Sequence, residues 1–166
     1  MSDLPYIQPK KELDLNMGIL LLILDNLAET VRGKRNLNIE KMQIFYFLVN
    51  NPLILNKALS MLGQQQRSIN HCEYYTVENL LLDVDDLYDK SKIALLLKMM
   101  SIKGYISVEF NKDEGFVFYL SEEGKKTLLH LDCNYFNKVR EIVRAASILR
   151  SKSLGKLNGL VNTVVR

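Results

Sequence analysis

The sequence predicts a mainly α-helical fold with one small β-hairpin, a fold of the α+β class. Two observations predict it. Apolar residues recur at helical spacing through most of the chain. In the segment 105–120, an imperfect alternation of apolar and polar residues is followed by a polar turn and an apolar return strand. With 166 residues, 48% of them hydrophobic, the chain can bury a sizeable core. We expect a tail over residues 1–13, a helical domain over 14–134 and a helical arm over 135–166.

Three helices are expected in the first third of the chain. Apolar side chains cover most of the circumference of the first, which should be central, largely buried and end near Gly33, with Val31 on its apolar stripe. Asn38 is a suitable N-cap for the second. The third should begin at Pro52 and end at Gly63, because Pro favours the first helical turn and Gly the position after the last.

A loop-like, acidic segment follows these helices. Residues 63–73 should form a surface connection, and Thr76 can cap a short helix that ends near Leu82. Residues 68–89 carry six acidic residues and no Lys or Arg. This segment should therefore repel phosphate groups.

The order of elements after residue 90 resembles a winged-helix domain. An apolar helix leads into a two-stranded wing over 105–120, which turns at 111–115, and Ser121 can then cap another helix. In most winged-helix domains the helix before the wing reads DNA with Arg, Lys, Asn or Gln side chains. Between Lys90 and Lys103 there is no Arg, Asn or Gln, so sequence-specific reading is not expected. Its apolar residues instead indicate burial on more than one side, in the core or against another protein.

The turn of the wing is also a poor phosphate clamp. Lys112 is followed directly by Asp113 and Glu114. Two carboxylates beside one ammonium repel the anion that the ammonium would attract. Contact between the wing and DNA is therefore not expected at this turn.

The arm over 135–166 is basic and amphipathic. Seven basic residues and one acidic residue lie between Lys138 and Arg166. Candidate contacts to nucleic-acid phosphates, without sequence preference, are Arg140, Arg144, Arg150, Lys152 and Lys156. Candidate partner-binding residues on an apolar stripe are Leu154, Leu157, Leu160, Val161 and Val164. The same stripe could equally be the inner face of a core helix.

No catalytic residue, cofactor site or metal site is predicted, and we expect that the protein is not an enzyme. The chain lacks the motifs GxxxxGK[ST], GxGxxG and HExxH and has no paired CxxC. A zinc site could draw on His71, Cys72, His130 and Cys133, but adjacent His and Cys do not have the spacing of a zinc knuckle.

The sequence also predicts a cytoplasmic protein that does not bind membranes. Its longest apolar run, over residues 17–24, is far shorter than the roughly 20 residues of a membrane span. The first residues, MSDLPYIQPKKELD, do not have the basic start and apolar stretch of a secretory signal. Two cysteines in the whole chain suit a reducing compartment.

Several stretches together resemble the middle components of bacterial ABC three-component systems. They are the apolar helical stretch IFYFLVNNPLILNKAL, the helix and wing KGYISVEF…FVFYLSEEG, and the helix from Tyr135 to Ala146. The resemblance, over about residues 14–150, implies a small winged-helix accessory subunit of Lamassu-type anti-phage defence. It implies an SMC-like ABC ATPase and a nuclease-type effector as partners, which would carry the chemistry. The alternative is a winged-helix DNA-binding transcriptional regulator.

Overall fold

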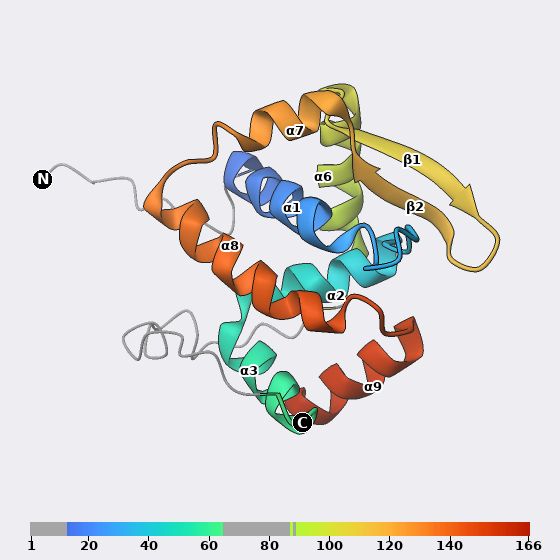
Figure 1. Ribbon diagram of the computed structural model, residues 1–166, viewed down its shortest axis with the longest axis vertical. Helices are drawn as coiled ribbons and strands as arrows, with labels where there is room; N and C mark the ends of the chain where they lie inside the picture. The colour runs from blue at the N-terminus through green and yellow to red at the C-terminus, as the bar shows by residue number, and fades with distance from the viewer. Residues whose placement is uncertain (1–12, 65–86, 88) are drawn as a thin grey trace, which may run out of the picture.

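The computed structural model in Figure 1 describes residues 13–64, 87 and 89–166. It is mainly helical with one antiparallel hairpin, which confirms the predicted α+β class. The elements are α1 (Leu13–Leu27), α2 (Ile39–Asn50), α3 (Pro52–Met61), α6 (Lys90–Ile102), β1 (Ile106–Asn111), β2 (Gly115–Leu120), α7 (Glu122–Leu128), α8 (Asn134–Ala146), η3 (Ser147–Leu149) and α9 (Leu154–Val165).

Helix α1 is the central element, as its apolar circumference predicts. It packs against α2, α6, α7, α8 and β2 and runs through the middle of the molecule in Figure 1. Leu20, Leu22 and Ile23 are completely buried. Burial of a side chain of this size contributes about 1.5–3 kcal/mol, so α1 anchors the core.

The end of α1 differs from the sequence prediction. The helix stops at Leu27, and Val31 is 86% exposed, so its place on an apolar helical stripe was wrong. The chain instead turns back along the hairpin. A local turn closed by the bridge between Glu29 and Arg35 replaces further helical turns, and Asn38 then forms a bridge with Val117 of β2.

The other helix boundaries confirm the capping predictions. The Asn38 side chain accepts a hydrogen bond from the Lys41 amide at 2.9 Å, and the Ser121 hydroxyl accepts one from the Gly124 amide at 3.0 Å. Pro52 begins α3, and Gly63 follows its end at φ +68°, a left-handed conformation that suits glycine. The short helix predicted from Thr76 lies outside the described residues.

Helix α6 is buried on one side only. Ile93, Leu96 and Met100 have at most 1% of their surface exposed, whereas Leu95 is 50% and Ile102 is 78% exposed. The described chain confirms burial of one side in the core, while contact of the other side with another protein remains a prediction. The buried side packs against α1 and α2, and the opposite side carries the exposed Leu95 and Ile102 together with Lys98.

Helices α8 and α9, which form the predicted arm over 135–166, pack on the same core as α1. Helix α8 lies along α1, and α9 lies against α2 and α3, below α8 in Figure 1. Gly18 makes the close packing of α1 and α8 possible, since a Cβ there would lie 2.5 Å from the Phe136 ring. Among the described residues, no helix has the length and apolar character to cross a membrane.

Candidate interaction surfaces

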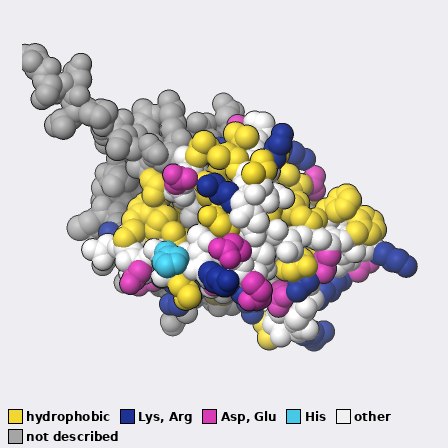
Figure 2. Space-filling model, turned by 90° about the horizontal axis from the view of Figure 1, so that it is seen from above, with side chains coloured by type: hydrophobic (Ala, Val, Ile, Leu, Met, Phe, Trp, Pro, Cys, Tyr) yellow, Lys and Arg dark blue, Asp and Glu magenta, His cyan; other side chains and the backbone are white. Residues whose placement is uncertain are grey.

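The hairpin presents two different faces. In the antiparallel register, Val108 pairs with Phe118 and Phe110 pairs with Phe116. Because side chains alternate between the two faces of a strand, these four apolar side chains lie on one face. Phe110 and Phe116 contact each other edge to face, with ring centroids 5.4 Å apart. Both rings nevertheless stay largely exposed, and Figure 2 shows hydrophobic side chains at the projecting end of the molecule, at the right. We call Val108, Phe110, Phe116 and Phe118 the wing face.

The opposite face of the hairpin is polar and internally paired. The Arg35 guanidinium lies 3.6 Å from the centre of the Tyr119 ring. It also donates hydrogen bonds to Glu29 at 3.1 Å and to Glu109 at 2.7 Å. The hydrogen bond to Glu29, followed by that to Glu109, raises the pKa of Arg35. Arg35 therefore holds this face to the segment that follows α1.

The turn of the wing is fastened to the chain by its two acidic residues. Asp113 accepts a hydrogen bond from the Lys34 ammonium at 2.9 Å, which raises the pKa of Lys34. Glu114 pairs with Lys41 at 2.9 Å, and the Glu114 carbonyl accepts a hydrogen bond from Asn38 at 3.2 Å. The acids that made this turn a poor phosphate clamp thus have a structural role.

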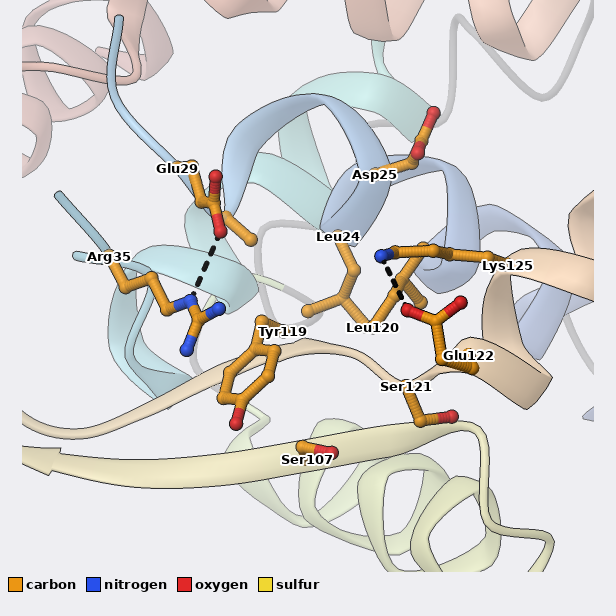
Figure 3. Close-up of a pocket in the computed structure, with 11 residues that line it drawn as sticks. Leu24, Asp25, Glu29, Arg35, Ser107, Tyr119, Leu120, Ser121, Glu122 and Lys125 are labelled. Atoms are coloured by element: carbon orange, nitrogen blue, oxygen red, sulfur yellow. Dashed lines mark hydrogen bonds and ion pairs between the residues drawn. The ribbon is translucent and has the colours of Figure 1, made fainter. Parts of the chain in front are cut away.

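A groove of about 400 Å³ lies between α1, β2 and α7 (Figure 3). Its charged side chains are largely paired. Lys125 Nζ lies 2.9 Å from Glu122 Oε1, and Arg35 Nε lies 3.1 Å from Glu29 Oε1. Partial burial raises the pKa of the Asp25 carboxyl, although Arg140, Lys125 and Arg144 act against this. The groove is lined by Leu24, Asp25, Ala28, Glu29, Arg35, Ser107, Tyr119, Leu120, Ser121, Glu122 and Lys125.

The residues available for catalysis or metal binding are few in the described chain. No group of three or more His, Cys, Asp or Glu side chains there could hold a metal ion. Of the four candidate zinc ligands, His130 and Cys133 are exposed, and His71 and Cys72 lie outside the described residues.

The five candidate phosphate contacts have different surroundings. Arg140 donates to the Asn137 side chain at 2.8 Å and to the Leu131 carbonyl at 3.3 Å, and Arg150 donates to the Asn26 carbonyl at 3.3 Å. Both guanidiniums thus support the chain itself. Arg144 and Lys156 are exposed, and Lys152 is half-buried. Contact with nucleic acid remains a prediction for all five residues.

The apolar stripe of α9 faces the core. Leu157 and Val161 are at most 1% exposed, and Leu154, Leu160 and Val164 are partly buried against the same core. The structure thus favours the core-helix interpretation, because α2 and α3 already cover this stripe. Partner binding through these five residues would require α9 to move and remains a prediction.

The wing face was missed as a surface by sequence reasoning. Val108 and Phe110 alternate with polar residues, which predicts one apolar face for β1 but not whether a helix covers it. In the structure their side chains are 46% and 69% exposed. The signal that could have located the surface is the polar turn beside them, which places the end of the hairpin away from the core.

Comparison with known proteins gives one match. The family model described as ABC-three component (ABC-3C) system Middle Component 4 matches residues 27–159. The matched region begins at the end of α1 and includes the hairpin and the first half of α9. No curated protein and no solved structure matches the chain.

Proposed function

Because the chain belongs to the Middle Component 4 family of ABC-three component systems, we propose that it is a non-catalytic adaptor subunit. In this proposal it bridges an SMC-like ABC ATPase and a nuclease-type effector in Lamassu-type anti-phage defence in the cytoplasm. The family match is the observation that carries the proposal, since a component of such a system works with partner proteins.

The distribution of exposed apolar residues supports an adaptor. Phe110, Phe116 and Ile102 are each more than 60% exposed, and Leu95 is 50% exposed. Exposed apolar side chains that lie together are a common mark of protein interaction sites. They lie on α6 and the hairpin, the elements that in a DNA-binding winged helix would face the duplex.

We expect the isolated protein to self-associate or to be poorly soluble, and co-expression with the ABC ATPase component to correct this. The physical reason is that a bound partner covers the exposed apolar surface and stabilises the folded chain by mass action. Size-exclusion chromatography of the chain alone and after co-expression measures the change. A stable monomer that does not bind the ATPase component would contradict the proposal.

A DNA-binding regulator is the second candidate, favoured by the exposed basic residues Arg144 and Lys156. Phosphate contacts by such residues give weak, salt-dependent binding without sequence preference. The exposed side of α6 instead presents Leu95, Lys98 and Ile102, a set without a bidentate base-reading side chain. Fluorescence anisotropy with two unrelated duplexes tests this candidate: the adaptor proposal expects equal, weak affinities, and strong preference for one duplex would support a regulator.

A further inference from the structure

Among the described residues, none pairs with the outer edge of strand β1. The Phe118 amide donates to the Leu37 carbonyl at 2.9 Å and so points away from β1. In an antiparallel ladder the residue opposite, Val108, then also directs its N–H and C=O away from its partner strand. Phe110, two residues further, has the same orientation. No described residue hydrogen-bonds to the backbone of Val108 or Phe110 on this outer side.

The outer edge of β2 is covered, in contrast. Leu37 accepts the hydrogen bond from the Phe118 amide, and Asn38 forms an antiparallel bridge with Val117. The hairpin can therefore take a further strand beside β1, whose edge no described residue covers. An edge with unpaired backbone groups is a template for pairing with another chain.

Exposed apolar side chains lie on the strands beside this open edge. Val108 is 46%, Phe110 69% and Phe116 64% exposed, and Figure 2 shows hydrophobic side chains gathered at this end of the molecule. Natural edge strands are usually protected by charged side chains or proline on the edge. On the wing face of β1 the exposed positions are instead Val and Phe, which a docked strand would cover.

Two exposed lysines flank β1, whereas the acids nearby are paired: Glu109 with Arg35, Asp113 with Lys34 and Glu114 with Lys41. Lys103 precedes the strand and Lys112 follows it, and both are exposed and form no ion pair with a described residue. Lys98 is also exposed and without such an ion pair, and helical spacing places it between Leu95 and Ile102 on α6. On the other face of the hairpin, by contrast, Arg35 is paired with acids. With the acids neutralised by their partners, the charge left at the two ends of β1 is positive, which favours an acidic partner segment.

We infer that β1 is a docking edge for an extended segment of a partner protein, with apolar residues at alternate positions and acidic residues at its ends. The segment adds as a strand beside β1 and hydrogen-bonds to the outward backbone groups of Val108 and Phe110. Its apolar side chains cover Phe110 and Phe116, and its acidic ends face Lys103 and Lys112. The inference rests on the proposed function, which supplies the partner proteins.

The substitution Val108→Pro tests the backbone pairing. Proline removes an N–H that the hairpin itself does not use, a position at which an edge strand tolerates it. The matched control Val108→Ala removes the exposed side chain but keeps the N–H. We expect Val108→Pro to weaken binding of the purified ABC ATPase component, or of the effector component, at least about tenfold relative to Val108→Ala, as for loss of a central interface contact. Equal binding by the two variants would overturn the inference.

Two side-chain variants keep the test decisive if Val108→Pro lowers the melting temperature. Phe116→Ser, on β2, should weaken binding with only a small loss of stability, because its ring is 64% exposed and loses the edge-to-face contact with Phe110, and Val31→Ser, at an 86% exposed site, is the surface control. Lys112→Glu should weaken binding most at low salt, because a charge in solvent is screened as the salt concentration rises. Unchanged binding by both variants would overturn the inference.

A defined DNA duplex separates this inference from the second candidate function. If the hairpin variants weaken duplex binding while binding of both protein components is unchanged, the surface contacts DNA and the inference is wrong. If the wild-type chain binds neither protein component, the proposed function fails and the inference fails with it. If the wild type binds but the hairpin variants bind equally well, only the inference fails.

Discussion

Lys41 Nζ lies 2.9 Å from Glu114 Oε1, and this ion pair joins α2 to the turn of the hairpin. The Lys41 side chain is 1% exposed and the Glu114 side chain 21% exposed. A charge this deeply buried needs its partner, because removal of one partner leaves the other without compensation. The position of the wing is therefore tied to the interior of the helical domain.

Glu114→Gln should cost more stability than Lys41→Met. The first leaves the buried ammonium unpaired, which costs about 3–5 kcal/mol. The second leaves only Glu114, whose carboxylate reaches solvent, and methionine fills much of the lysine volume. Urea unfolding of both single variants and of the double variant gives the coupling energy. A larger loss for Lys41→Met, or additive effects, would contradict this account.

Gly124→Ala and Gly159→Ala should have opposite effects on stability. A Cβ on Gly124 would lie 2.1 Å from the Tyr105 carbonyl oxygen, so α7 would have to move from the start of the hairpin. We expect a loss of about 1–3 kcal/mol, as in overpacked sites. Gly159 has open space around its Cβ position, and alanine there should stabilise α9 by about 0.5–1 kcal/mol. Thermal unfolding checks both signs.

Substitutions on the two sides of α6 should separate core from surface. Leu96→Ala or Met100→Ala should lower the free energy of unfolding by about 2–5 kcal/mol, because both side chains are completely buried. Leu95→Ala, at a 50% exposed position, should change it by no more than about 0.5 kcal/mol. Equal losses at Leu95 and Leu96 in denaturant unfolding would contradict the orientation of α6.

Asp25→Asn should stabilise the protein at neutral pH. Burial raises the pKa of this carboxyl above its ordinary value of 3.8. The protonated carboxyl contributes stability at pH values below its pKa in the unfolded chain. This contribution is lost as the pH rises through its pKa in the folded protein. The variant should therefore melt higher than the wild type at neutral pH, and the difference should disappear on acidification below 3.8.

Glu122→Gln is the control of opposite sign. The hydrogen bond from Lys125 lowers the pKa of Glu122, so its contribution is present above its unfolded pKa and is lost as the pH falls through its folded pKa. This substitution should slightly lower the melting temperature at neutral pH. If both variants shifted melting in the same direction at neutral pH, the assignment of burial as the cause at Asp25 would be wrong.

Local signals predicted the elements well because short-range physics decides them. Asn38 and Ser121 cap helices through their own side chains, and the polar turn at 111–115 between two apolar stretches located the hairpin of β1 and β2. The end of α1 was predicted too late, because Val31 continues the apolar spacing, whereas the chain turns through the local bridge of Glu29 with Arg35 and is then held by the pairing of Asn38 with Val117 of β2. That pairing joins residues distant in sequence.

The candidate sites were harder to predict because composition does not show which partner covers a side chain. The stripe of α9 has the spacing of a docking helix, but Leu157 and Val161 face α2 and α3. Lys41 would be a surface residue by its type, and only the contact with Glu114 explains its burial. The wing face lies in a segment with clear strand periodicity, yet its exposure depends on how far the hairpin extends beyond the core.

The adaptor role is tested most directly by the mass of the complex that the ABC ATPase component and the effector component form with and without this chain. Light scattering after size-exclusion chromatography of the purified components provides that mass. We expect one complex that contains all three proteins when the chain is present, and separate ATPase and effector species when it is left out. An ATPase–effector complex that forms equally well without the chain would contradict the bridging role.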